Sequence, residues 1–344
     1  MIKNVTIRDL AKSAGVSRST VSRVLTNNPH VDPKTRDKVM RAMEHLQYAP
    51  NEVARSLVRG YHQHLSLIVI DIRNPFFAEL ARGVEAVGFE NNCPVAIFNT
   101  DDDVNRERAC LSLVERSPGV GAIIVPSQDE SALITRINRI RSPFVLLSRY
   151  LTTRPEQSAV YFDNLQGAQI ATEHLVSLGH TRIAYLEGPE NSVACHDRTQ
   201  GFTITMQHHN LEIDPSLIGH GRLRIEDGYH FARSLVLANR NFTALFCSSD
   251  LMAIGALRAF QEMKIRVPED ISVIGFDDIW LADLPHIKLT TIHQPAFAMG
   301  YRAAELILRP KENEPVHHVF RPSLVLRGTT AHLTSFPHFI NQNN

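Results

Sequence analysis

Residues 5–25 have the sequence VTIRDLAKSAGVSRSTVSRVL, and this stretch decides the fold of the amino-terminal part of the chain. Thr6 and Asp9 have the spacing of a capping box, which predicts a helix that ends at Gly15. Ser17 predicts the cap of a second helix, which fills the rest of the stretch. Two short helices joined by so tight a turn are typical of a helix-turn-helix motif.

A third helix is predicted to begin at Asp32, with Pro33 in its first turn. Together the three helices can form a small core, for which we expect Ile7, Leu10, Ala11, Ala14, Val21, Val24, Leu25, Val39, Met40, Met43 and Leu46. The second helix keeps Arg18, Ser19, Ser22 and Arg23 on its outer face. An ordinary three-helix bundle with a solvated basic face has the same spacing, so spacing alone leaves DNA binding open.

The charge of the chain is distributed unevenly. Residues 1–62 contain 11 Lys and Arg residues against 5 Asp and Glu residues, whereas the rest of the chain contains 25 against 31. A basic segment attached to an acidic body is typical of polyanion binding by one module, because Lys and Arg neutralise phosphates. The basic segment is therefore the candidate DNA-binding part.

Residues 5–25, together with VDPKTR at 31–36 and the pattern Tyr-x-Pro-Asn-x-x-Ala-Arg-Ser-Leu at 48–57, closely resemble the head of the lactose/galactose repressor family. The resemblance implies that Arg18 and Ser19 lie at positions that vary between members to choose the operator. It also implies that Thr20, Ser22 and Arg23 make base and phosphate contacts that are shared across the family. The implied DNA-binding set here is Thr6, Ser17, Arg18, Ser19, Thr20, Ser22 and Arg23. Arginine suits this role, since its guanidinium can bind the O6/N7 edge of guanine.

The same resemblance makes residues 50–62 a hinge helix and linker. It implies that two copies of the helix Asn51–Arg59 pair in the minor groove, with Leu57 inserted as a wedge at the central base step. Asn51, Ala54, Arg55 and Leu57 are the implied DNA contacts of this segment. The alternative is a polar linker with one exposed leucine.

Beyond the hinge, short apolar runs alternate with amphipathic stretches. The expected strands are Leu65–Ile70, Val95–Phe98, Gly121–Val125, Phe144–Leu147, Arg182–Leu186, Ala244–Cys247 and Ile271–Gly275. Such runs indicate parallel sheets covered on both faces, so the body is α/β. The family resemblance extends over nearly the whole chain and implies a two-lobed, periplasmic-binding-protein-like, doubly wound core.

We therefore expect a helix-turn-helix domain at residues 1–49, a hinge helix and linker at 50–62, and a core for effector binding and dimerisation at 63–333. The expected N-lobe comprises about 63–163 plus 296–322, and the expected C-lobe comprises about 164–293 plus 323–333. Residues 334–344 form a short polar tail without leucine heptads, which favours a homodimer over a tetramer.

The resemblance also implies an effector site between the lobes. Phe76 and Phe77 would line the N-lobe, while Arg198 and Asp277 would be the polar anchors of the C-lobe, since an Arg and an Asp can share donor and acceptor roles around a hydroxylated or heterocyclic ligand. The other implied site residues are Asn74, Asp163, Leu223, Ser249 and Trp280. The alternative is that Arg198 and Asp277 only pair with each other or cap helices.

Two positions depart from the family pattern. Ser249 stands where many sugar-responsive members have Asn, and Leu223 stands where an aromatic side chain often stacks on the effector. Trp280, the only tryptophan, could supply a stacking surface or could pack in the core. The effector class therefore stays open between a sugar, a sugar derivative and a nucleoside.

Enzymatic and metal sites have little support in the sequence. It has no Gly-x-Ser-x-Gly elbow and no His-Glu-x-x-His motif. We interpret Cys195-His196-Asp197 as a loop that lines the cleft rather than a metal site, because adjacent residues point in different directions. No catalytic residue, metal or cofactor is expected. The remaining rivals are a plain binding protein and a DNA-architectural protein without an effector.

Four widely spaced cysteines and the absence of a secretory or membrane-spanning apolar run indicate a reduced cytoplasmic protein, which would act on the bacterial nucleoid. The sequence thus predicts a transcriptional repressor that binds a palindromic double-stranded operator as a homodimer. A small-molecule effector, either an inducer or a corepressor, would switch its operator affinity.

Overall fold

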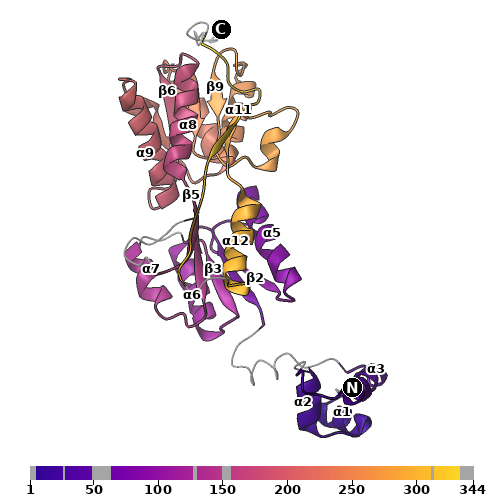
Figure 1. Ribbon diagram of the computed structural model, residues 1–344. Coiled ribbons are helices and arrows are strands. Elements are labelled where there is room, and N and C mark those ends of the chain that lie inside the picture. The colour runs from indigo at the N-terminus through magenta and orange to yellow at the C-terminus, as the bar shows by residue number, and fades with distance from the viewer. Residues whose placement is uncertain are drawn as a thin grey trace. The chain divides into compact units, whose positions relative to one another are not determined.

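The computed structural model describes residues 5–25, 28–48, 63–126, 130–148, 156–310 and 314–333, with the backbone alone for 130–133. The chain forms two compact units, residues 1–62 and 63–344, and each is described by itself (Figure 1). The polar tail and the predicted hinge residues Asn51, Ala54, Arg55 and Leu57 lie outside the described residues.

The first unit contains the helices α1 (Ile7–Ala14), α2 (Arg18–Leu25) and α3 (Pro33–His45). Thr6 and Asp9 form the predicted capping box, and Gly15 ends α1 in the left-handed conformation at φ +66°. The Ser17 hydroxyl accepts a hydrogen bond from the backbone N–H of Thr20 at 3.1 Å, which caps α2. The predicted start of all three helices is confirmed.

One predicted core residue of this unit is wrong. Met40 is 52% exposed, whereas Ala42 is buried against Leu10, Val21 and Val39. The physical reason is the helical period. Val39, Ala42, Met43 and Leu46 are spaced by three or four residues and share the buried face of α3, whereas the Met40 side chain projects to one side of that face.

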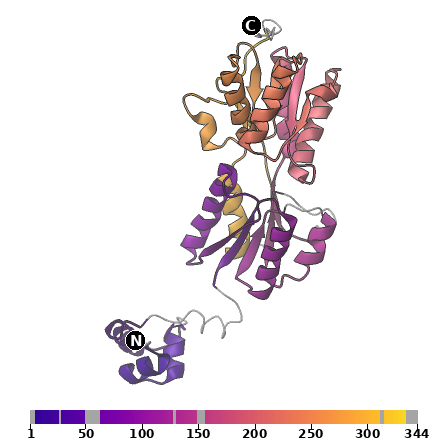
Figure 2. The ribbon, with the colours of Figure 1, turned by 180° about the vertical axis from the view of Figure 1, so that it is seen from behind.

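In the second unit, the first sheet has six parallel strands in the order β11-β5-β4-β3-β1-β2. The strands are β1 (Leu65–Val69), β2 (Val95–Asn99), β3 (Gly121–Ile124), β4 (Phe144–Leu147), β5 (Ala159–Phe162) and β11 (His317–Phe320). Helices α6 (Val104–Arg116) and α7 (Glu130–Ile137) cover one face, and α5 (Pro75–Glu90) and α12 (Ala296–Leu308) cover the other (Figures 1 and 2).

Helices α5 and α12 lie side by side because glycines let their backbones approach. A Cβ added at Gly83 would lie 2.0 Å from the carbonyl oxygen of Phe297, and one added at Gly300 would lie 2.0 Å from that of Leu80. This packing fixes α12, which comes late in the chain, against the first helix of the same lobe.

The second sheet has four parallel strands in the order β7-β6-β8-β9. They are β6 (Ile183–Glu187), β7 (Ile218–His220), β8 (Ala244–Cys247) and β9 (Ser272–Ile274), with short 3₁₀ turns at Pro215–Leu217 and Trp280–Asp283. Helices α8 (Asn164–Ser177) and α9 (Val193–His208) pack on one face, and α10 (Ile225–Leu237) and α11 (Asp250–Glu262) pack on the other. β10 (Thr291–His293) and β12 (Ser323–Val325) form a separate antiparallel pair.

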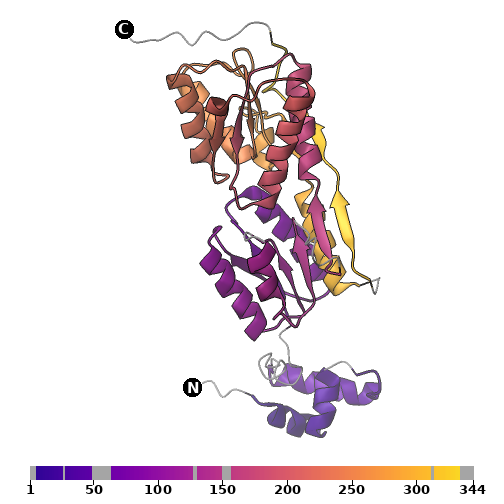
Figure 3. The ribbon, with the colours of Figure 1, turned by 90° about the vertical axis from the view of Figure 1, so that its left-hand side faces the viewer.

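The chain passes between these two lobes more than once. It leaves the first sheet after β5, returns between β10 and α12, and leaves again between β11 and β12 (Figure 3). Each predicted strand is present, with bounds within one residue of those observed. The α/β, doubly wound, two-lobed prediction is confirmed. No helix in the described part of the chain is long and apolar enough to cross a membrane.

Candidate functional site

The outer face of α2 is polar and basic, as predicted. Its exposed side chains are Arg18, Ser19, Ser22 and Arg23, while Thr20 is half-buried. The Ser17 hydroxyl lies 2.7 Å from that of Ser19 and 2.9 Å from that of Thr20, so this end of the helix presents a cluster of hydroxyl groups. Guanidinium and hydroxyl groups on an exposed helix can contact base edges and phosphates in a major groove.

Thr6 is exposed, but its hydroxyl already belongs to the capping box. It donates to Asp9 Oδ2 at 2.7 Å and accepts from the Asp9 N–H at 3.4 Å. Thr6 therefore caps α1. The hydroxyl that would contact a phosphate is the one that already bonds Asp9.

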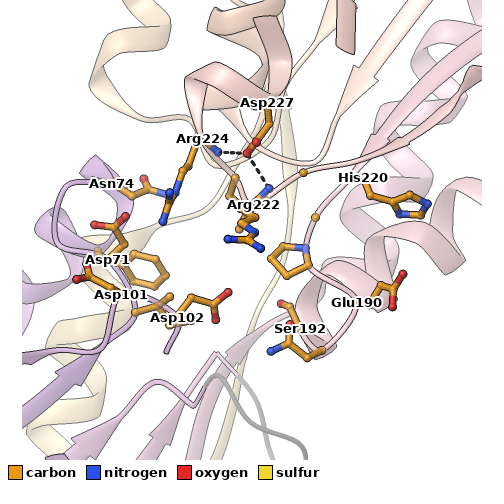
Figure 4. Close-up of a pocket in the computed structure, with 17 residues that line it drawn as sticks. Asp71, Asn74, Asp101, Asp102, Glu190, Ser192, His220, Arg222, Arg224 and Asp227 are labelled. Carbon is orange, nitrogen blue, oxygen red and sulfur yellow. Dashed lines mark hydrogen bonds between the residues drawn. The ribbon is translucent and has the colours of Figure 1, made fainter. Parts of the chain in front are cut away.

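Two cavities are lined by residues from both lobes of the second unit. An inner cavity of about 70 Å³ is lined by Phe76, Phe77, Phe162, Arg198 and Asp277 among others. An outer cavity of about 650 Å³ is lined by Asp71, Asp101, Asp102, Arg222, Arg224 and Asp227 among others (Figure 4). Asn74 and Leu223 line both, so the two cavities adjoin.

The N-lobe wall of the inner cavity begins with α5. Asn74 caps this helix by accepting the N–H of Phe76 at 3.0 Å, and Pro75 occupies its first turn. Phe76 and Phe77 then follow as an edge-to-face pair with ring centroids 5.2 Å apart. The structure thus places these three predicted residues together on an apolar wall with one amide.

The C-lobe wall holds the predicted Arg198, which is buried in α9. Its Nε donates to Asn164 Oδ1 at 2.9 Å, and its Nη1 donates to the carbonyl oxygen of Ser248 at 2.5 Å. The guanidinium lies 3.9 Å above the Phe276 ring and 3.6 Å from Asp277 Oδ1. Arg198 and Asp277 therefore form an ion pair, and both still line the cavity.

Asp277 is a strained and buried carboxylate. Its φ of +120° is rarely adopted by a residue with a side chain, and such strain is concentrated at functional sites. Burial raises the pKa of Asp277 to about 6, although the Arg198 charge and a 2.6 Å hydrogen bond from Gln294 Nε2 oppose the rise. A carboxyl group in this state can accept or donate a hydrogen bond to a ligand near neutral pH.

Charged side chains from both lobes line part of the outer cavity. Asp71, Asp101 and Asp102 come from the N-lobe, and Arg222 and Arg224 come from the loop before α10 in the C-lobe (Figure 4). Between the two arginines, Leu223 has a φ of +60°, a left-handed conformation that costs free energy for a non-glycine residue. Leu223, predicted at a stacking position, lines both cavities as an aliphatic side chain.

Three predicted residues lie elsewhere. Ser249 is fully buried and caps α11 by accepting the Met252 N–H, and Asp163 caps α8 by accepting the Gln166 N–H at 2.9 Å. Neither lines the inner or the outer cavity. Trp280 is 67% exposed and so does not pack in the core; it lines a separate groove beside α12 that shares Asp277 with the inner cavity.

Sequence reasoning missed four polar residues of the inner cavity: Ser148, Asn164, Ser192 and Gln294. The Ser148 hydroxyl is buried and has no hydrogen-bond partner in the described part of the chain. For Ser148 and Asn164 a signal was available in the sequence order, because each lies one or two residues after a strand of the parallel sheet, where open α/β sheets bind ligands.

The interpretation of Cys195-His196-Asp197 as a loop is wrong. The triplet lies in the first turn of α9, which Ser192 caps, and only Cys195 turns inward to line the inner cavity, three residues before Arg198. Within the described ranges, no group of three or more His, Cys, Asp or Glu side chains is placed to hold a metal ion.

Comparisons with known proteins agree with this geometry. Residues 6–51 match the model of bacterial regulatory proteins of the lacI family, and residues 172–330 match a periplasmic binding protein-like domain. The transcriptional regulator DegA of Bacillus subtilis is 35% identical, covering 96% of this chain and 99% of its own. The transcriptional repressor PurR of Aliivibrio fischeri is 33% identical, covering 95% and 98%. A crystal structure of the lac repressor dimer bound to operator and the anti-inducer ONPF has a TM-score of 0.85 at 28% identity, covering 96% and 100%.

These relatives are transcriptional regulators and not enzymes, and the matches extend over both the helix-turn-helix unit and the two-lobed core. The chain belongs to the LacI family of bacterial regulatory proteins and is a DNA-binding transcriptional regulator with a ligand-binding core.

Proposed function

We propose that this protein is a repressor whose operator affinity is switched by a small molecule bound between the two lobes. The observation that carries the proposal is the Arg198–Asp277 pair, in which two buried charged groups line a cavity between lobes. Such a pair is a poor way to stabilise the fold, because the free-energy cost of desolvating both charges often exceeds the free energy gained from their attraction. A ligand that hydrogen-bonds to both groups would offset that cost.

The lining of the cavity supports a hydroxylated ring as the effector. Phe76, Phe77 and Phe162 provide apolar faces, and Asp277, Arg198 and the Ser148 hydroxyl provide hydrogen-bonding groups. A sugar, a sugar derivative or a nucleoside has both features. The inner cavity alone is too small for any of them at about 70 Å³, so the ligand would extend into the outer cavity past Leu223.

For the DNA-binding part, the proposal rests on the family. Residues 1–49 form the helix-turn-helix domain, with Arg18, Ser19, Thr20, Ser22 and Arg23 in the major groove. Residues 50–62 form the hinge, with Leu57 as a minor-groove wedge. The related lac repressor is a dimer on its operator, and a two-fold dimer of this chain would read a palindromic operator of the bacterial nucleoid.

In the core, the proposed boundaries follow the sheets. An N-lobe of about 63–163 plus 296–322 and a C-lobe of about 164–293 plus 323–333 are connected by the three crossings. The effector closes the lobes and changes the separation of the two hinges in the dimer. It can shift this equilibrium only by the difference between its affinities for the two states.

The first test is selection of the purified full-length protein against random duplex DNA, followed by sequencing. We expect a palindrome with a flexible central step. An enriched site without two-fold symmetry would contradict the dimeric operator, and no enrichment with or without added small molecules would contradict the repressor.

The second test is a thermal-shift screen with monosaccharides, sugar phosphates and nucleosides. For the compound that raises Tm, we expect Arg198→Lys to weaken binding by at least about tenfold, because lysine loses the forked geometry. Operator affinity without the compound should stay within about twofold. Arg182→Lys, at a half-exposed ion pair with Asp214 on the same lobe, is the control and should leave compound binding unchanged. Equal loss in both variants would contradict the assigned site, and the absence of any binding compound would favour a DNA-architectural protein without an effector.

A further inference from the structure

The outer cavity brings side chains of opposite charge together from the two lobes. Asp71 and Asp102 line it from the N-lobe, after β1 and β2, and Arg222 and Arg224 line it from the C-lobe, before α10. Arg73 lies beside the cavity, where its guanidinium binds Asp71. Glu226 follows in the first turn of α10. The lining thus carries acidic side chains on the N-lobe and arginines on the C-lobe.

Asp102 is the uncommitted carboxylate of the N-lobe side. It has a φ of +58°, lines the cavity and makes no hydrogen bond or ion pair within the described ranges. Its neighbours are already paired, because Asp71 binds the Arg73 guanidinium at 2.8 Å and Asp101 binds that of Arg106.

On the C-lobe side, the loop at residues 222–224 has a backbone held by hydrogen bonds and carries two guanidinium groups, those of Arg222 and Arg224. Asp227 accepts the backbone N–H of Arg222 at 2.7 Å and that of Arg224 at 3.1 Å, which fixes the backbone on both sides of Leu223. The two guanidiniums form no ion pair or hydrogen bond within the part of the chain described here. In Figure 4 both side chains extend toward the aspartates of the other lobe.

The charges already influence one another across the gap. Burial raises the pKa of Asp102, and the Arg222 and Arg224 charges oppose that rise. The pKa of Asp71 is lowered mainly by Arg73, with a smaller contribution from Arg224. Glu226 contributes to the raised pKa of Arg73 after Asp71 and Asp101. The pairs that join the two lobes combine opposite signs, and none of these interlobe pairs lies within ion-pair distance in the described conformation.

We propose that these side chains form an interlobe latch, in which Asp102 pairs with Arg222 as the lobes close, while the existing Asp71–Arg73 pair adds Arg224 on its acidic side and Glu226 on its basic side. This inference rests on the proposed function, since it assigns part of the closing free energy of the effector cleft to the protein itself. The other charged groups that line the cavity are Asp101, Glu190, His220 and Asp227. Asp101 is paired with Arg106, His220 with Glu187, and Asp227 with the backbone of the arginine loop. The latch favours the closed state even before an effector adds its own contacts.

The experiment measures the distance between the lobes in the full-length protein without effector or DNA. Spin labels are introduced as unnatural amino acids at Ala109 on α6 and Ser234 on α10, both exposed, and diluted with unlabelled protein. Pulsed electron resonance then gives the ratio of closed to open populations. At low ionic strength we expect Asp102→Arg and Arg222→Asp each to lower this ratio by about two- to fivefold, the effect of an accessible ion pair.

The double variant Asp102→Arg/Arg222→Asp should restore the ratio, because it exchanges the two charges. Arg258→Gln, which breaks an exposed ion pair with Glu262 away from the cavity, is the control and should leave the distances unchanged. The latch is overturned if the single reversals leave the distances unchanged or if the double variant fails to restore them. Neither result depends on finding an operator or a compound, so failure of the latch and failure of the proposed function are distinguishable.

Discussion

At the scale of single residues, the cleft combines charge burial with backbone strain. Asp277 and Leu223 both have positive φ values, and Arg198 is enclosed by Asn164, Ser248 and Phe276. Such arrangements persist only where the surrounding fold holds them in place. We interpret them as a site preorganised for a ligand, whose carboxylate and guanidinium need little rearrangement on binding.

The raised pKa of Asp277 predicts a stability effect with a defined sign. The folded protein holds this proton up to about pH 6, whereas an unfolded aspartate releases it near 3.8, so stability falls as the pH rises through that window. Between pH 5 and pH 7 the loss from this group is about 1 kcal/mol. Asp277→Asn should remove it, as measured by urea unfolding at both pH values. An identical pH dependence in the two proteins would show that Asp277 ionises normally.

At the scale of elements, a buried histidine attaches the segment after β12 to the rest of the C-lobe. His180 Nδ1 lies 3.0 Å from Thr243 Oγ1, and Nε2 lies 3.0 Å from Ser272 Oγ and 3.1 Å from the carbonyl oxygen of Ala331. A neutral ring satisfies these partners, with one nitrogen donating and the other accepting. The segment after β12 is thus connected to β8 and β9 through one side chain.

The hydrogen bonds of His180 predict a contribution to stability that increases with pH, opposite in sign to that of Asp277. Burial lowers the pKa of His180, so the neutral form stabilises the fold above pH 6.5 and that stabilisation is lost as the pH falls below it, by at most about 1.4 kcal/mol per pH unit. His180→Gln should lose less stability between pH 7.5 and pH 5.5 than the natural protein, in thermal unfolding. His196→Gln, an exposed histidine of α9, is the control. Equal acid sensitivity of all three proteins would rule out the role of His180.

Local chemistry explains which elements could be predicted from the sequence. The capping box at Thr6 and the apolar run Phe144–Leu147 depend on neighbours in sequence, and the structure has both as predicted. β5, β7, β10, β11 and β12 were missed because short strands depend on pairing with distant strands. The cap formed by Ser249 is equally local, although the family pattern assigned that residue to the effector site. The inward position of Ser148 depends on tertiary packing, so the sequence alone did not indicate it.

At the scale of the whole molecule, regulation requires two sites that influence each other through a shared conformational equilibrium. If a bound compound changes operator affinity by a given factor, bound operator must change the affinity for that compound by the same factor. Both affinities can be measured on the full-length protein, once the selected operator and the compound from the thermal-shift screen are available.

The hinge gives the sharpest test of this coupling. Leu57→Ala removes the proposed wedge, so operator affinity should fall by at least about tenfold, because the kinked DNA loses the contact that offsets unstacking. Affinity for the compound, measured by calorimetry without DNA, should be unchanged, since the residues of the cleft are intact. Leu237→Ala, at an exposed leucine of α10, serves as the matched control and should change neither affinity. If Leu57→Ala binds operator as tightly as the natural protein, Leu57 does not act as a wedge, and the contribution of the hinge must come from its other implied contacts or be absent.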